Sequence, residues 1–104
     1  MLSEHLKNQI KERLLARFNP DKIILFGSQA RNTADDKSDV DLLVICETKG
    51  DKFTLMNHMR FALLPINYAF DVIILSNEEF ERDKKYPGTV ARYASKEGIL
   101  LYER

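Results

Sequence analysis

The sequence predicts an α/β protein with a small mixed β-sheet packed with α-helices. Three short runs of branched and aromatic apolar residues have the length and composition of buried strands. They alternate with longer stretches in which apolar residues recur every three or four positions, which is typical of amphipathic helices. The 104 residues suffice for one hydrophobic core but not for two. Residues 1–104 are therefore expected to form a single domain.

The N-terminal segment is predicted to form an amphipathic helix that precedes the first strand. Apolar residues recur along it at Leu2, Leu6, Ile10, Leu14 and Phe18. Ser3 can cap its start, and Pro20 is expected to end it, because proline lacks the amide that a helix interior needs. The first strand is expected at residues 23–26, a short helix at residues 28–32 and a polar loop at residues 33–37.

The middle of the chain is expected to add a strand, a helix and another strand. Residues 40–45 are apolar on both faces beyond Asp41, so helices or loops should cover both sides of the sheet. A helix is predicted at residues 51–64, and Pro65 ends it. Its apolar residues include Phe53, Met56, Met59 and Leu63. The third strand is expected at residues 68–75.

The C-terminal part is predicted to contain two helices and an edge strand. Residues 76–79 have the pattern of a capping box, which starts a short helix. Pro87 is expected to open the next helix, and Gly98 to cap its C-terminus. The apolar face of that helix should consist of Val90, Tyr93 and Ala94. Residues 99–102 are expected to form a short final strand at the edge of the sheet.

Charge and composition argue against several classes of protein. The sixteen basic and sixteen acidic side chains cancel, whereas a dedicated nucleic-acid-binding domain usually carries a basic excess. The single cysteine, Cys46, excludes an intrachain disulfide and a cysteine-based zinc site, and it is expected to pack as a small apolar residue. The sequence has neither a leader pattern nor an apolar stretch long enough to cross a membrane, so a cytoplasmic location is expected.

Two aspartates at the start of the second predicted strand carry the strongest functional signal. Asp39 and Asp41 point to the same face, because side chains alternate along a strand. At a separation of about 6 Å and an effective dielectric constant near 20, their charges repel by roughly 2–3 kcal/mol. A divalent metal ion between them would offset this repulsion. The Gly27-Ser28 turn after the first strand suggests that the metal carries phosphate.

This arrangement resembles the nucleotidyltransferase superfamily that includes DNA polymerase β, and it looks most like the minimal nucleotidyltransferases (MNT proteins) of prokaryotes. The superfamily pattern is a Gly-Ser pair, a small residue before arginine, a spacer, an Asp-x-Asp pair beside a strand, and a third carboxylate that opens a later strand. The residues that match it are Gly27, Ser28, Ala30, Arg31, Ser38, Asp39, Asp41, Leu42 and Asp71. The resemblance implies the nucleotidyltransferase fold.

The resemblance also implies a catalytic site, in which an acceptor hydroxyl attacks the α-phosphate of a nucleoside triphosphate and expels pyrophosphate. Asp39 and Asp41 would bind two Mg²⁺ ions. Asp71 would complete the metal site on the acceptor side, where it could also help to take the hydroxyl proton. The choice of ATP as the substrate comes from the family.

The Gly27-Ser28 turn is where the resemblance puts the β- and γ-phosphates. Gly27 lets the backbone approach phosphate without a Cβ in the way, and Ser28 adds a hydroxyl donor. Arg31 could contact the triphosphate or brace the loop. The chain has no lysine at the position that a Walker-type loop requires, which argues against a P-loop NTPase.

Larger members of the superfamily add a second domain that holds the acceptor, whereas only about thirty residues follow Asp71 here. Another chain is therefore expected to supply the missing wall. In the MNT family that chain is typically a helical HEPN protein, often a ribonuclease toxin, and several MNT proteins act as antitoxins that transfer AMP from ATP to its tyrosine. The alternatives are a non-enzymatic antitoxin that acts by binding, a small-molecule (antibiotic-type) nucleotidyltransferase, and a nucleic-acid polymerase, which the neutral charge disfavours.

Overall fold

The computed structural model describes residues 2–31 and 39–104, in which helices and strands follow one another in the predicted order. The elements are α1 (Glu4–Arg17), β1 (Lys22–Phe26), α2 (Ser28–Arg31), β2 (Val40–Ile45), α3 (Lys52–Ala62), β3 (Phe70–Leu75), α4 (Asn77–Asp83), α5 (Val90–Glu97) and β4 (Ile99–Glu103). The predicted α/β class is confirmed. The polar loop predicted at residues 33–37 lies outside the described residues. None of the described helices combines the length and apolar character that a membrane span needs.

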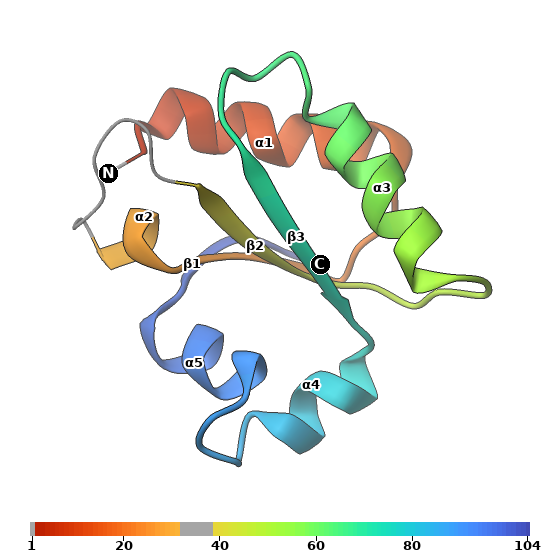
Figure 1. Ribbon diagram of the computed structural model, residues 1–104, viewed down its shortest axis with the longest axis vertical. Coiled ribbons are helices and arrows are strands. Elements are labelled where there is room, and N and C mark those ends of the chain that lie inside the picture. Colours follow the sequence, from red (N-terminus) through yellow and green to blue (C-terminus); the bar gives the residue numbers. More distant parts are fainter. Residues whose placement is uncertain (1, 32–38) are drawn as a thin grey trace.

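The strands form one mixed sheet in the order β3-β2-β1-β4. β1 pairs antiparallel with both β2 and β4, whereas β2 and β3 run parallel. Parallel neighbours need a crossover connection, and α3 provides it (Figure 1). The mixed sheet and the edge position of β4 agree with the prediction. Consequently the N-terminal ends of β2 and β3 lie side by side at the end of the sheet where β1 finishes.

Helices cover both faces of the sheet, as the apolar run of β2 predicts. α1 and α3 lie on one face, and α4 and α5 on the other (Figure 1). Leu42 and Val44 pack in the core shared with α1 and α3, whereas Leu43 packs with Phe80 of α4 and Ala94 of α5. Because both faces of β2 are buried along most of its length, only the start of the strand offers room for charged groups.

Two predicted helix starts are confirmed by their capping residues. The Ser3 hydroxyl accepts a hydrogen bond from the Leu6 amide (3.2 Å), and a reciprocal capping box between Ser76 and Glu79 begins α4. Lys52 Nζ donates to Glu79 Oε1 at 2.7 Å. This hydrogen bond and that from the Ser76 amide lower the pKa of Glu79 to about 2. α3 and α4, which cover opposite faces, are thus joined at the carboxyl end of β3.

α5 begins at Val90 rather than at the predicted Pro87. Gly88 has a φ of 90°, which lies outside the helical region. The Thr89 hydroxyl accepts a hydrogen bond of 3.1 Å from the amide of Arg92 and caps the helix. The turn chemistry of these residues therefore overrides the tendency of proline to occupy the first turn.

The buried face of α5 also differs from the prediction. Ala91 and Ala94 are buried, whereas Val90 is 37% exposed and Tyr93 is half-buried. Two small residues let the helix approach β1 closely. Gly98 ends the helix, as predicted, and a Cβ there would overlap the Ala94 carbonyl. Its backbone is extended, with a φ of −78°, so close packing rather than a left-handed cap requires glycine at this position.

Cys46 follows β2 directly and is buried in the core, which confirms the predicted packing role. Burial raises the pKa of its thiol, and the nearby carboxylates of Asp21 and Glu47 raise it further. The thiol is therefore poorly suited to act as a nucleophile.

Candidate active site

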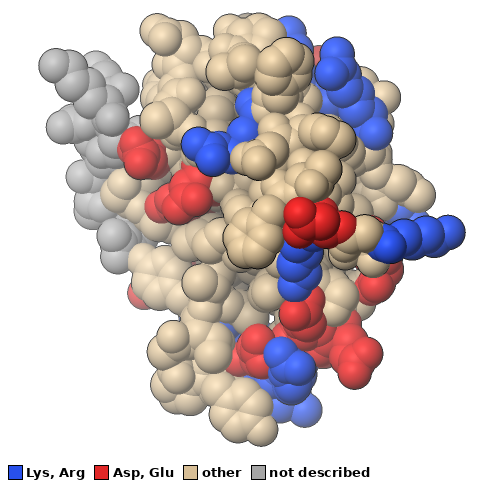
Figure 2. Space-filling model, turned by 45° about the vertical axis from the view of Figure 1, so that its right-hand side comes forward, with Lys and Arg blue, Asp and Glu red and all other residues tan. Residues whose placement is uncertain are grey.

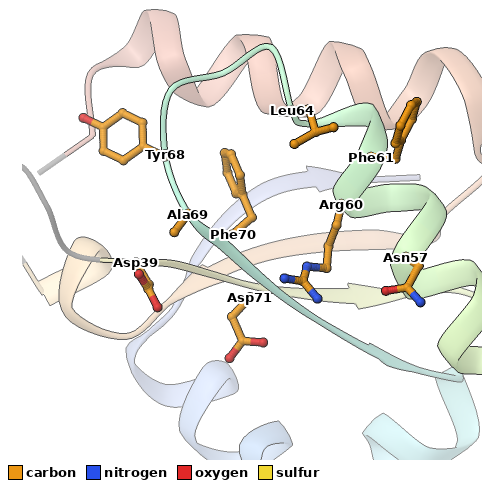
Figure 3. A pocket seen from close by; sticks show the side chains of 9 residues that line it. All are labelled: Asp39, Asn57, Arg60, Phe61, Leu64, Tyr68, Ala69, Phe70 and Asp71. Carbon is orange, nitrogen blue, oxygen red and sulfur yellow. The ribbon is translucent and has the colours of Figure 1, made fainter.

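The parallel pairing of β2 and β3 places three aspartates on one face of the sheet. Asp41 and Asp71 are direct partners in the register of the two strands, so their side chains leave the same face. Asp39 lies two residues before Asp41 and points the same way. Figure 3 shows the carboxylates of Asp39 and Asp71 directed to the same side. The three predicted metal ligands thus share the face that carries α4 and α5.

The charges of these three aspartates act on one another. The pKa of Asp41 is raised, first by burial and then by the negative charges of Asp71 and Asp39. Asp41 is half-buried, whereas Asp39 and Asp71 are exposed. An arrangement of this kind favours a positive charge among the carboxylates.

The donor set suits a divalent cation that keeps part of its water shell. Carboxylate oxygens are ligands that Mg²⁺ prefers, and water and substrate oxygens can complete its octahedron. Within residues 2–31 and 39–104, no three His, Cys, Asp or Glu side chains form a ready-made metal site. The charges of Asp71 and Asp39 nevertheless contribute, after burial, to raising the pKa of Asp41. Their carboxylate oxygens are of the kind that a hydrated Mg²⁺ ion accepts as ligands.

Gly27 follows β1 and lies against the carboxylate of Asp41. Its φ of 77° falls in the region that favours glycine. A Cβ built on Gly27 would overlap Asp41 Oδ2 and lie 3.2 Å from Asp41 Cγ. Only glycine therefore allows the turn to approach the acidic cluster this closely.

The predicted phosphate-binding residues surround the start of α2. Ser28 is half-buried at the first position of this single-turn helix, and the Ala30 amide donates to the Gly27 carbonyl at 3.1 Å. Arg31 ends the helix, but its side chain lies outside what the structure describes, as does Ser38. Gly27 is thus beside Asp41 and Ser28 follows it directly in the chain, while the phosphate-binding roles of both and the two roles considered for Arg31 stay predictions.

Comparisons with known proteins assign this geometry to a family. Residues 8–104 match the model of the family described as "Polymerase beta, Nucleotidyltransferase". The chain belongs to this nucleotidyltransferase family. It is 32% identical over 95 residues, which are 91% of this chain and 89% of the relative, to a protein of Methanocaldococcus jannaschii named "Putative protein adenylyltransferase".

Two solved structures share the fold of this nucleotidyltransferase. One is a toxin-antitoxin with AMP-PNP, with a TM-score of 0.70, 19% identity and coverage of 94% of this chain and 73% of that chain. The other is a mutant of the toxin-antitoxin MntA-HpeT, with a TM-score of 0.67, 16% identity and the same coverage of 94% and 73%. The nucleotidyltransferase fold implied by the resemblance is therefore confirmed.

A pocket of about 560 Å³ opens beside β3 of the nucleotidyltransferase, with two of the aspartates in its wall. Asp39 and Asp71 line one side, and Asn57, Arg60 and Phe61 of α3 line another (Figure 3). The Arg60 side chain extends from α3 toward β3, and within the described part of the chain it forms no salt bridge. A molecule that enters this pocket meets carboxylates on one side and a guanidinium group on the other.

The side of α3 next to this pocket is apolar and exposed. Phe53, Phe61 and Leu64 are 72%, 67% and 68% exposed, whereas Met59, which the prediction groups with Phe53, is fully buried. Phe53 and Phe61 lie on the same side of α3 as Asn57 and Arg60, because positions three, four, seven or eight apart fall on one side of a helix. Leu64 follows the end of α3 and lines the same pocket as Arg60 and Phe61. We call the set the α3 strip; it consists of Phe53, Asn57, Arg60, Phe61 and Leu64. Contiguous exposed apolar side chains are typical of surfaces that bind other molecules.

Figure 2 shows this side of the molecule turned toward the reader. Acidic side chains lie next to the grey segment, a basic side chain lies close to them, and mostly uncharged surface surrounds both.

Two polar residues of the pocket wall, and one buried polar residue outside it, were not predicted from the sequence. Asn57 and Arg60 could have been suspected, because the helix around them has apolar residues on more than one side, which indicates a second contact surface. Gln29 in α2 is only 3% exposed. No pattern in the sequence distinguishes this buried glutamine from an exposed one.

Proposed function

We propose that this nucleotidyltransferase transfers AMP from ATP to a hydroxyl of a partner protein, most simply a tyrosine of a HEPN toxin, and thereby acts as an antitoxin. The observation that carries the proposal is the placement of Asp39, Asp41 and Asp71 on one sheet face beside Gly27. The name of the Methanocaldococcus jannaschii relative supports AMP as the transferred group. The toxin-antitoxin structures with the same fold support a toxin as the partner.

The aspartates have separate tasks in this proposal. Asp39 and Asp41 would hold two Mg²⁺ ions, which when bound would supply positive charge to offset the negative charge that develops during the transfer. Asp71 would complete the metal site on the acceptor side, where it would also help to take the proton of the hydroxyl. The acceptor oxygen forms a bond to the α-phosphorus, and the bond from that phosphorus to the bridging oxygen of pyrophosphate breaks. The products are an AMP ester of the acceptor and pyrophosphate.

Gly27 and Ser28 hold the β- and γ-phosphates. The missing Cβ of Gly27 leaves room next to Asp41, and the Ser28 hydroxyl can donate to a phosphate oxygen. Arg31, at the end of α2, either contacts the triphosphate or braces the segment that follows it.

A protein acceptor accounts for the α3 strip. The strip borders the pocket that contains Asp39 and Asp71, so a protein bound to it would reach the acceptor side of the site. Its apolar residues suit apolar side chains of a partner, and the Arg60 guanidinium suits a carboxylate of the same partner. A small-molecule acceptor would leave the exposed phenylalanines without a role.

The proposal is tested with ATP labelled at the α-phosphate, Mg²⁺ and the protein encoded by the neighbouring gene. We expect label on the partner when all components are present, and none when EDTA removes the metal. Mass spectrometry of the labelled partner then identifies the modified residue. A partner that stays unlabelled at saturating ATP would contradict the proposal.

The same assay separates the alternatives. A non-enzymatic antitoxin inhibits its partner without any transfer of label, and this inhibition persists in EDTA. A small-molecule nucleotidyltransferase labels an antibiotic with free hydroxyls and leaves the partner unlabelled. The three readings therefore differ in which component carries the label.

Replacing Phe61 by serine is expected to raise the KM for the protein acceptor roughly thirtyfold, which corresponds to the loss of about 2 kcal/mol at a contact hot spot. The affinity for ATP should not change, because Phe61 lies on α3 and away from Gly27. Leu100→Ser is the matched control, since Leu100 is 51% exposed on β4 at the other edge of the sheet. Equal values of KM for the two variants would argue against the α3 strip as the partner's binding surface.

A further inference from the structure

A second pocket lies beside α5, on the sheet face that also carries the aspartates. It measures about 480 Å³, and residues from the end of β1 and from α5 line it. We call it the α5 pocket; its lining includes Phe26, Val90, Arg92, Tyr93, Lys96 and Glu97. The rings of Phe26 and Tyr93 meet edge to face, with centroids 6.2 Å apart and planes at 73°.

The α5 pocket begins next to the predicted phosphate site. Phe26 precedes Gly27 in the chain and is the partner of Asp41 in the register of β1 and β2. Opposite residues of an antiparallel pair place their side chains on the same face, so Phe26 and Asp41 are neighbours there. A ligand whose phosphates bind at Gly27 and Ser28, beside Asp41, can therefore reach Tyr93 by extending past Phe26.

The wall of the α5 pocket suits a flat heteroaromatic ring. Its lining includes the half-buried rings of Phe26 and Tyr93, whereas Val90, Lys96 and Glu97 are exposed residues of the same lining. A heteroaromatic ring has apolar faces and polar edges, and it fits a site with apolar walls and a few polar groups.

We propose that the α5 pocket binds the base of the nucleotide whose phosphates bind at Gly27 and Ser28, and that it favours a purine. This inference rests on the proposed function, because that function places the phosphates. Once the phosphates are placed, the ribose and the base are the only parts of a nucleoside triphosphate left to fill a pocket. A purine presents more ring surface to Phe26 and Tyr93 than a pyrimidine does, and it therefore stacks more strongly.

Calorimetry in the presence of Mg²⁺ tests the proposal with ATP, CTP and tripolyphosphate, which has phosphates but no base. We expect the wild type to bind ATP at least about tenfold more tightly than tripolyphosphate, with CTP between them. Tyr93→Leu keeps an apolar side chain but removes the flat ring. It should therefore lower the affinity for ATP about tenfold and leave the affinity for tripolyphosphate unchanged. Tyr86→Leu is the matched control, because Tyr86 is 59% exposed and does not line the pocket.

Phe26→Leu provides a second variant with the same expected pattern, should Tyr93→Leu fold poorly in thermal melting. Equal affinities of the wild type for ATP and tripolyphosphate would overturn the base pocket and leave the phosphate site standing. If the wild type bound neither ATP nor tripolyphosphate, the phosphate site of the proposed function would be contradicted. The base pocket, which depends on that site, would then be contradicted as well. If Tyr86→Leu lowered the affinity for ATP as much as Tyr93→Leu does, the proposal would also be overturned.

Discussion

The double variant Asp39→Asn, Asp41→Asn is expected to lose about a thousandfold or more of the transfer activity. Metal ions stabilise transition-state charge by several kcal/mol, and a loss of about 4 kcal/mol corresponds to this factor. Asparagine keeps the shape of aspartate and one oxygen ligand, but it lacks the negative charge that holds a divalent cation. Single-turnover transfer of labelled AMP to the partner measures the effect.

The control for the double variant is Glu12→Gln, which removes an exposed carboxylate on α1. It should transfer AMP at the wild-type rate. A double variant that retains the wild-type rate would show that Asp39 and Asp41 do not hold the catalytic metal.

The single change Asp41→Asn is expected to stabilise the protein at neutral pH when EDTA is present. Burial and the charges of Asp71 and Asp39 raise the pKa of Asp41 in the folded state above the ordinary value of 3.8. Protonated Asp41 therefore favours the folded state; this contribution is fully present below about pH 3.8 and is lost as the pH rises through the folded-state pKa. Asparagine stays neutral, so its advantage should appear above that pKa and vanish in acid. Thermal melts across the acidic range measure the difference.

A gain in stability joined to a loss of activity would distinguish a functional cluster from a structural one. Residues that serve the fold destabilise it when they are replaced, whereas carboxylates that repel one another destabilise it when they are kept. The combination fits the general finding that perturbed pKa values gather at functional sites.

The acidic site could be predicted from the sequence because most of its signals are local. The period of two along a strand fixes Asp39 and Asp41 to one face, and the helix between the two apolar runs makes their strands parallel. The register that pairs Asp41 with Asp71 is not local. It depends on how α3 packs against both strands, and a shift by one residue would have turned Asp71 to the opposite face.

The features that the sequence did not reveal depend on contacts between distant segments. The α5 pocket joins Phe26 of β1 to Tyr93 of α5, and no spacing rule links residues so far apart. Phe53 is exposed because none of the described helices and strands covers its side of α3. The spacing of apolar residues in the sequence does not show whether a helix has one buried apolar face or a second, exposed one. The late start of α5 reflects a positive φ at Gly88, which the preceding proline does not predict.

Gly27→Ala is expected to reduce transfer about a hundredfold, the factor associated with misplacing a catalytic group by about 1 Å. The new Cβ would overlap Asp41 Oδ2, so the carboxylate has to turn away from Asp71 or the turn has to move. Binding of tripolyphosphate in the presence of Mg²⁺ should weaken in parallel, because the turn and the carboxylate both contribute to that site. The φ of 77° adds a backbone strain of about 1–2 kcal/mol, which thermal melting reports separately.

The variant Gly88→Ala separates the two effects of Gly27→Ala, the backbone strain and the overlap with Asp41. Gly88 has a similar φ of 90°, but a Cβ there meets nothing within 4 Å. Both variants should therefore lose a similar amount of stability, while only Gly27→Ala loses binding of tripolyphosphate. The comparison uses this ligand because Gly88 borders the α5 pocket, and a ligand without a base does not depend on that pocket. If both variants bound tripolyphosphate as tightly as the wild type, the contact between Gly27 and Asp41 would have no part in holding phosphate.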